Sequence, residues 1–371
     1  MNKEILFPRP TGSYAIGTKL FELTDPSRMD PETHKPREFV VQIWYPAAGK
    51  LGLTTAPYAY ETREICKQGL VKQGVSTEKL HLIDGLKTYA IPDASVCGDH
   101  APYPVVIFGH GFGATRGGYS LLCEELASHG YVVMMAVHTH GSRLVRFADG
   151  HEVTSLFETS MSAVFEDCFA DVQLMLNQVI AGAFGHLTPA CDFKIIGMVG
   201  HSLGGVMTAQ MCRRDARVKA GISLDGALWG IDATKPFHKP FLFLRTPTFY
   251  KDMIQFLDSR QEPFNSVGIT RDNFTGSIER FCRENGSDTR QIIVQGASHK
   301  TFCDDPLIQE LFEKCTTNVT PRCEVPRVLP VPLMLEVIRG CMLAFFDTYV
   351  KSKPTPSSCG DGARPEPRSG C

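Results

Sequence analysis

A Gly-x-Ser-x-Gly motif offers the clearest chemistry in this chain, at Gly200-His201-Ser202-Leu203-Gly204. An apolar run precedes the motif and a helical run follows it, which predicts a buried strand, a sharp turn and a packed helix. Gly200 and Gly204 suit that turn, because the backbone passes close to itself where a Cβ would collide. The motif therefore predicts Ser202 as the nucleophile of an acyl transfer, held beside the free N–H groups of the following helix.

A serine hydroxyl needs a base within hydrogen-bond reach, and the base needs an orienting carboxylate. Asp225 follows a strand expected at 218–224, and His299 follows a strand expected at 290–294. The order serine, aspartate, histidine is the one that this type of elbow uses, and catalytic groups collect at the carboxyl ends of parallel strands. We expect His299 to take the proton of Ser202 and Asp225 to fix the tautomer of His299.

Each assignment has alternatives. Other carboxylates could take the place of Asp225, namely Asp232, Asp304 and Asp305. Two of these, Asp304 and Asp305, follow His299 and break the order. Other histidines could act as the base, namely His110, His138 and His140. Only His299 follows the final strand. His201 is expected to be a packed residue of the elbow, with its side chain directed away from Ser202.

A second glycine-rich stretch follows the apolar run 103–108 and reads Gly109-His110-Gly111-Phe112-Gly113-Ala114. A strand that opens into such a loop supplies the other half of an oxyanion hole, and a plain glycine turn is the alternative. We expect the backbone N–H groups of Phe112 and Leu203 to bind the oxyanion. The pair His138 and His140 could suggest a metal, but no further ligand recurs at metal-site spacing, so neither a metal nor a cofactor is predicted.

The elements that must position these groups alternate along the chain. Uniformly apolar strands are expected at 38–46, 103–108, 131–137, 194–200, 218–224, 240–244 and 290–294. Amphipathic helices are expected at 119–129, 164–180 and 331–350 and after the elbow. This alternation predicts an α/β fold with a mostly parallel central sheet and helices on both faces. Within the helix at 164–180, the carboxylates of Glu166, Asp167 and Asp171 are expected to face solvent.

Composition is that of an ordinary globular protein, with 371 residues, 43% hydrophobic residues, 21% charged residues and a net charge of -2. The lack of a basic excess argues against a nucleic-acid partner. Thirteen scattered cysteines are expected to be mostly buried free thiols. We predict a single domain at 1–350, with an N-terminal extension at 1–38 packing on it, a flap at 143–160 and a segment at 246–289 that could form a cap. Residues 351–371 are expected to be a disordered tail, and the modification of Cys359 and Cys371 there is left open.

The start of the chain lacks the apolar region of a signal peptide, and no run approaches the roughly 20 apolar residues of a membrane span. Three N-glycosylation sequons, at Asn273, Asn285 and Asn318, point weakly the other way. A cytoplasmic location is therefore expected, with membrane association left open.

Several ordered motifs together resemble one family. They are G-H-S-L-G-G at 200–205, S-L-D-G-A at 223–227, G-A-S-H at 296–299, F-G-H-G-F-G-A at 108–114 and C-E-E-L-A-S-H-G-Y-V-V at 123–133. The chain resembles the platelet-activating factor acetylhydrolases of the lipoprotein-associated and intracellular type II kind, also called group VII phospholipases A2, from about Pro10 to Phe346. The resemblance implies an α/β-hydrolase fold. It also implies calcium-independent cleavage of short or oxidised sn-2 acyl chains from phospholipids, through an acyl-enzyme.

On this resemblance the family's triad falls on Ser202, Asp225 and His299, and its oxyanion amides fall on Phe112 and Leu203. The implied partners are a phospholipid substrate and a transient lipid-interface contact, while the oligomeric state is left open. The family more often has Leu at the place of Phe112 and Phe at the place of Leu203, so the acyl-length preference is left open. The alternative function is a general carboxylesterase or polyester hydrolase of the cutinase or dienelactone-hydrolase type, which shares the elbow and the triad order. A catalytically inactive binding module is a third reading, against which the intact triad argues.

Overall fold

A computed structural model describes residues 5–49, 55–59, 62–72, 75–155, 161–230, 235–261, 269–314 and 330–352. Several predictions concern residues outside these ranges: Asp232 as an alternative carboxylate, the sequon at Asn318, residues 156–160 of the expected flap, residues 262–268 of the expected cap, and nearly all of the tail expected to be disordered at 351–371.

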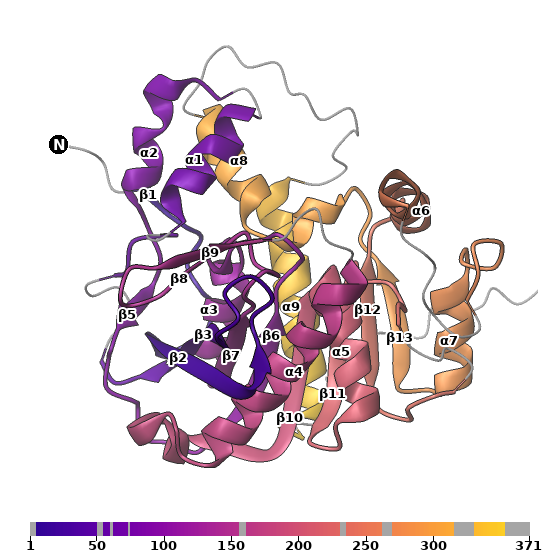
Figure 1. Ribbon diagram of the computed structural model, residues 1–371, viewed down its shortest axis with the longest axis horizontal. Helices are drawn as coiled ribbons and strands as arrows, with labels where there is room; N and C mark the ends of the chain where they lie inside the picture. Colours follow the sequence, from indigo (N-terminus) through magenta and orange to yellow (C-terminus); the bar gives the residue numbers. More distant parts are fainter. Residues whose placement is uncertain are drawn as a thin grey trace, which may run out of the picture.

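The described residues build a central sheet of nine strands in the order β13-β12-β11-β10-β6-β7-β3-β2-β5 (Figure 1). Their bounds are β2 Ala15–Met29, β3 Pro36–Ala47, β5 Ala90–Pro92, β6 Tyr103–Gly109, β7 Val132–Val137, β10 Cys191–His201, β11 Val218–Leu224, β12 Phe241–Arg245 and β13 Thr289–Ile293. Strand β3 runs antiparallel to both of its neighbours, β2 and β7, and the other pairs in the sheet are parallel. The prediction of a mostly parallel sheet is confirmed.

The strand order reverses between β6 and β10. The chain leaves β6 for β7 on one side and later returns to β10 on the other side. In open α/β sheets such a reversal opens a crevice outside the carboxyl ends of the two strands, and ligands bind there. The two glycine-rich loops of the sequence follow β6 and β10, so both lie at this crevice.

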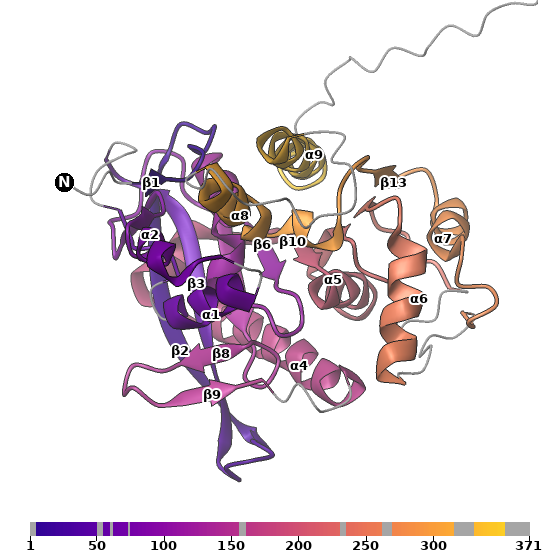
Figure 2. The ribbon, with the colours of Figure 1, turned by 90° about the horizontal axis from the view of Figure 1, so that it is seen from above.

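Helices cover both faces of the sheet (Figure 2). The core on one face contains residues of α3 Ser120–Ser128 and α9 Val331–Tyr349. The core on the other face contains residues of α4 Met161–Ile180 and α5 Leu203–Arg214. The remaining helices are α1 Arg63–Lys72, α2 His81–Asp84, α6 Phe249–Arg260, α7 Ser277–Asn285 and α8 Asp305–Lys314. Short strands complete the fold, namely β1 Ile5–Leu6, β4 Leu86–Lys87, β8 Leu144–Arg146 and β9 Glu152–Thr154. Short 3-10 helices lie at Thr77–Lys79, Arg116–Tyr119, Gly185–Ala190 and His299–Phe302.

The N-terminal segment is more than an extension, because β2 is a full member of the sheet and pairs with β3 over most of its length. The region expected as a flap contains the β8–β9 hairpin, and the region expected as a cap contains α6 and α7. None of the helices in the described part of the chain is long and apolar enough to cross a membrane.

Candidate active site

The nucleophile elbow is a sharp turn between β10 and α5. Ser202 lies between the two elements with φ 55° and ψ -117°, a conformation that non-glycine residues rarely adopt. A Cβ on Gly204 would overlap the backbone of Gly109, and a Cβ on Gly200 would overlap the backbone of Gly204. Glycine is therefore required at both ends of the motif. A strained serine held in place by its surroundings is typical of functional sites.

Asp225 and His299 form a hydrogen-bonded pair at the ends of β11 and β13. The His299 Nδ1 atom lies 2.7 Å from Asp225 Oδ2, and Asp225 Oδ1 accepts a hydrogen bond of 2.8 Å from the backbone N–H of Thr246. Asp225 is buried, whereas the His299 side chain is 39% exposed. The carboxylate thus fixes Nδ1 as the nitrogen of His299 that carries the proton, so Nε2 is the nitrogen that can act as a base.

The other carboxylates and histidines that the sequence offered as alternatives, where the structure describes them, do not line the cavity that contains Ser202. Asp304 is buried and accepts a 3.4 Å hydrogen bond from the backbone N–H of Leu121, and Asp305 forms an ion pair with Lys300. The alternative histidines are all buried around the loop that follows β7: His110, His138 and His140. Among the residues that the structure describes, no group of three or more potential ligands is arranged to hold a metal ion.

One cavity of about 330 Å³ joins the predicted catalytic residues: Ser202, Asp225 and His299 all line it. The two residues expected to supply oxyanion amides, Phe112 and Leu203, line it as well. Its remaining walls are mostly apolar and include Val206, Ala227, Leu228, Trp229, Phe249, Met253, Phe256, Leu257, Ile269 and Phe274. Several of these come from α6 and the segment before α7, so the region expected to form a cap supplies one wall of the cavity. A mostly apolar cavity with a few convergent polar groups is the usual form of a small-molecule site.

His201 links three loops of the site. Its Nε2–H donates to the carbonyl oxygen of His299 over 2.9 Å, which leaves Nδ1 to accept a 2.9 Å hydrogen bond from the hydroxyl of Tyr119. That hydroxyl in turn accepts the N–H of Gly111 over 2.9 Å. Burial, with a smaller effect of His299, holds the pKa of His201 well below its usual value, so the ring stays neutral and keeps this tautomer. The sequence suggested only a packed residue here, and nothing local points to Tyr119 as its partner.

The loop expected to form half of the oxyanion hole is tied to the loop after β7. The Gly113 N–H donates to the carbonyl of Gly141 over 2.8 Å. His110 Nε2 accepts hydrogen bonds from the Ser142 hydroxyl at 2.9 Å and from the backbone N–H of His138 at 3.3 Å. Burial, together with His138, lowers the pKa of His110 to about 3, so its ring is neutral. The loop that carries Phe112 is therefore held by its neighbour.

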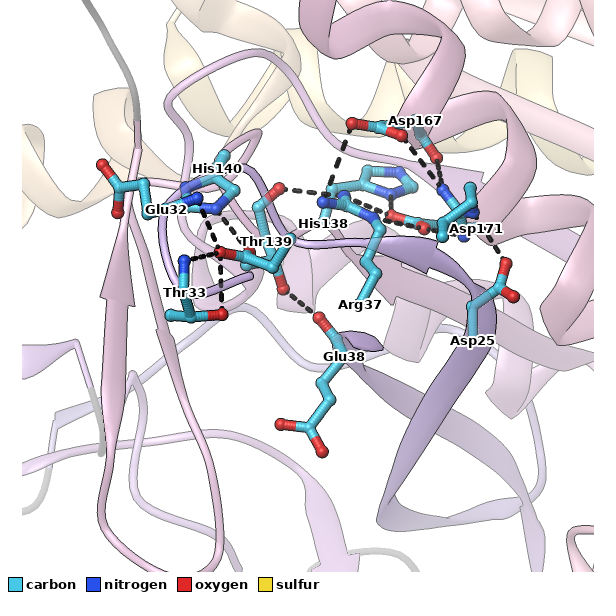
Figure 3. A network of polar contacts seen from close by, with 12 residues as sticks. Asp25, Glu32, Thr33, Arg37, Glu38, His138, Thr139, His140, Asp167 and Asp171 are labelled. Atoms are coloured by element: carbon cyan, nitrogen blue, oxygen red, sulfur yellow. Dashed lines mark hydrogen bonds and ion pairs between the residues drawn. The ribbon is translucent and has the colours of Figure 1, made fainter. Parts of the chain in front are cut away.

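A buried ion network anchors that neighbouring loop (Figure 3). Arg37 on β3 donates to both carboxylate oxygens of Asp171 on α4, at 2.9 and 2.8 Å, and to the carbonyl of Thr139 at 3.0 Å. His138 Nδ1 lies 3.1 Å from the same carboxylate, and Arg28 on β2 donates to it over 2.6 Å. On the far side of the loop, His140 Nε2 lies 2.7 Å from Asp30 Oδ2.

The expectation that Asp171 faces solvent is wrong, because its side chain is fully buried. Burial by itself would raise the pKa of this carboxyl, but the hydrogen bonds from Arg37 and His138 outweigh burial and hold it far below its usual value. A buried carboxylate needs such partners, and one of them lies 134 residues away in the sequence. No local pattern could reveal it.

Comparison with known proteins shows which families and proteins this chain is similar to. Residues 1–159 match a family model described as platelet-activating factor acetylhydrolase, isoform II, and residues 105–314 match a model described as alpha/beta hydrolase family. A probable 1-alkyl-2-acetylglycerophosphocholine esterase of Arthroderma benhamiae is 28% identical over 243 residues, which cover 61% of this chain and 60% of that protein. The platelet-activating factor acetylhydrolase of Canis lupus familiaris is 23% identical over 235 residues, which cover 54% of this chain and 48% of that protein.

These matches confirm the resemblance expected from the motifs, although they span less of the chain than the motifs suggested and only about half to 60% of the relatives' length. Among solved structures, a ferulic acid esterase from Streptomyces cinnamoneus superposes with a TM-score of 0.70 at 24% identity, over 97% of both chains, and supports the fold. Since the alpha/beta hydrolase model covers more than half of the sequence, the chain belongs to the alpha/beta hydrolase family, and platelet-activating factor acetylhydrolases are among its relatives.

Proposed function

We propose that this protein is a carboxylic ester hydrolase that works through an acyl-enzyme on Ser202. The observation that carries the proposal is the cavity at the reversal of strand order, which is lined by a strained serine and by a hydrogen-bonded aspartate–histidine pair. Those three residue types, delivered by three loops at the carboxyl edge of one sheet, are the parts that serine-dependent acyl transfer needs.

In the proposed reaction, His299 takes the proton of Ser202 as the hydroxyl attacks the ester carbonyl, and then returns it to the leaving alcohol. Asp225 keeps the His299 ring in the right tautomer and stabilises its cation. A water molecule then attacks the acyl-enzyme while His299 takes its proton. His299 returns that proton to Ser202 as the acid product leaves. No step of this scheme uses a metal ion.

The developing oxyanion would be bound by the backbone N–H groups of Phe112 and Leu203. Leu203 is the first residue of α5, so its N–H is among those that have no acceptor within the helix. Phe112 sits in the loop that is tied to the segment after β7. Donors fixed before the reaction stabilise the transition state without any reorganisation, and one such donor is commonly worth about 10²–10³ in kcat.

We further propose that the substrates are phospholipids such as platelet-activating factor that carry a short or oxidised sn-2 acyl chain, cleaved without calcium. Support comes from the names of the relatives, which include a 1-alkyl-2-acetylglycerophosphocholine esterase, and from the match of the first 159 residues. The mostly apolar walls of the cavity suit the hydrocarbon parts of such a molecule.

The test compares hydrolysis of a 2-acetyl and a 2-palmitoyl phosphatidylcholine in the presence of EDTA. We expect acetyl release to persist with EDTA, to exceed palmitate release greatly and to vanish in Ser202→Ala. The matched control is Ser76→Ala, because Ser76 is exposed and its side chain makes no capping bond. Cleavage of p-nitrophenyl acetate without cleavage of either lipid would leave the triad standing and favour a general carboxylesterase. Full activity in Ser202→Ala would contradict the proposal.

A further inference from the structure

A second, smaller cavity adjoins the catalytic one across the glycine-rich loop after β6. It has a volume of about 150 Å³ and shares four wall residues with the catalytic cavity: Gly113, Ala114, Tyr119 and Lys300. Its other walls come from the region of α1 and α2, from the start of α8 and from Arg143. Any group bound there would sit one loop away from the ester bond that Ser202 is proposed to attack.

The charged side chains of this cavity lie on its open side. Arg143 is exposed, and the Lys300 side chain is 66% exposed, whereas the apolar wall residues Leu70, Ile83 and Ile308 are buried. The cavity thus has an apolar floor and a cationic mouth.

The positive charge of the Arg143 side chain is available to a ligand. Within the described part of the chain, its guanidinium forms no hydrogen bond or ion pair, although its backbone is well anchored. The N–H of Arg143 donates to the carbonyl of Ala114 over 2.9 Å, and its own carbonyl accepts the N–H of Ser155 over 3.3 Å. The side chain therefore starts from a fixed point beside the proposed oxyanion loop and remains free to bind a ligand.

Lys300 is partly neutralised, because its ammonium lies 3.2 Å from the carboxylate of Asp305, which lines the same cavity. Two cations and one carboxylate leave a single net positive charge at the mouth. One singly charged anion matches that charge, and an arginine suits a phosphate because its planar fork donates two parallel hydrogen bonds.

We propose that Arg143, assisted by Lys300, binds the phosphodiester on the alcohol half of the substrate. This inference rests on the proposed function, because it takes the substrate to be a glycerophospholipid. In such a molecule the phosphodiester is attached to the glycerol carbon next to the one that carries the sn-2 ester. With the ester at Ser202, the phosphate would extend past Lys300, an exposed residue that lines both cavities, to the cationic mouth. The subsite would then discriminate a phospholipid from a neutral glyceride with the same acyl chain.

The test uses two acetyl esters, 1-alkyl-2-acetylglycerophosphocholine and the neutral 1-alkyl-2-acetylglycerol, both kept below their aggregation thresholds. The measured quantity is the ratio of kcat/KM for the phospholipid to kcat/KM for the neutral ester. Hydrogen bonds to charged groups are strong enough that we expect this ratio to fall roughly tenfold in Arg143→Met, mainly through KM for the phospholipid. Arg143→Lys should recover part of the ratio, and Arg143→Glu should lower it further.

Arg146→Met serves as the matched control, since Arg146 lies three residues away and pairs with Glu152 in the β8–β9 hairpin. The ratio should not change in this variant. An unchanged ratio in both Arg143→Met and Arg143→Glu, or a parallel fall for both esters, would overturn the subsite while Ser202-dependent cleavage of the neutral ester kept the proposed function intact. Failure of the wild-type enzyme to cleave either ester would instead overturn the proposed function, and the subsite with it.

Discussion

The loop expected to supply the oxyanion amide of Phe112 lies between two regions that use charge in opposite ways. On one side, the Arg37–Asp171–His138 network is buried and its carboxylate is paired with several donors. On the other side, the catalytic cavity is mostly apolar and its histidine is partly exposed. The nearby Arg143 side chain is exposed and forms no ion pair with the residues that the structure describes.

The buried network supports the loop, whereas the groups around the catalytic cavity take part in the proposed chemistry. Buried charges that are paired hold backbone in place, because breaking one pair would leave an uncompensated charge in a dry interior. Groups that must bind or exchange protons with a substrate stay accessible. The first region should therefore govern stability, and the second should govern activity.

The largest effect is expected from the catalytic pair. Asp225→Asn keeps the shape of the side chain but allows the wrong tautomer of His299, so kcat should fall on the order of 10³–10⁴. The unfolding midpoint in urea should change little by comparison. The contrast breaks down if kcat falls less than about tenfold, a result that would favour another carboxylate as the partner of the base.

The next effect concerns the ion network. Asp171→Ala leaves the buried Arg37 and its neighbour Arg28 without their shared carboxylate, so the free energy of unfolding should fall by about 3–5 kcal/mol. Urea denaturation followed by circular dichroism measures this loss. Asp167→Ala is the matched control on the same helix, because its side chain is 39% exposed, and it should lose less than about 1 kcal/mol. Equal losses of unfolding free energy in the two variants would contradict the claim that the buried carboxylate stabilises the fold more than the exposed one.

A smaller effect is expected where the two regions meet. Tyr119→Phe removes the hydroxyl that joins the Gly111 N–H to His201 Nδ1 and leaves both buried groups without this partner. A penalty of about 1–3 kcal/mol is normal for such groups. Some of it should fall on kcat, by roughly tenfold, because Gly111 lies beside Phe112 and His201 contacts the carbonyl of His299. A loss of stability with unchanged kcat would mean that the bridge has no positioning role.

The smallest effect is a pH dependence. Since the pKa of Asp171 is held below its usual 3.8 in the folded state, its stabilising contribution is present above that value and is lost as the pH falls through the folded-state pKa. The difference in unfolding free energy between the wild type and Asp171→Ala should therefore shrink as the pH is lowered below about 4. A difference that stays constant down to the acid limit of folding would contradict the assigned ionisation.

Local patterns carried the predictions that succeeded. The alternation of apolar strands and helices predicts the parallel sheet, and the two glycine-rich turns could be recognised because a strand precedes each within a few residues. The structure also brings Ser202, Asp225 and His299 to one cavity, as their order along the chain suggested, while their roles remain predictions.

Features that local sequence patterns do not reveal were missed. Strand β2 contains Asp25-Pro26-Ser27, which indicates a turn, yet β3 pairs with the strand on both sides of this irregularity. Asp171 was assigned to solvent from its helical position, but its burial depends on an arginine from another strand. Arg143 carries no motif at all, and only the position of its loop beside the cavity brings it into the argument.

The most direct test of the central claim is labelling with a fluorophosphonate, followed by peptide mass spectrometry. The account predicts one adduct, on the peptide that contains Ser202. It also predicts no labelling of Ser202→Ala and labelling slowed by orders of magnitude in His299→Ala. A folded wild-type protein that stays unlabelled, or an adduct on another serine, would contradict the claim that Ser202 is an activated nucleophile.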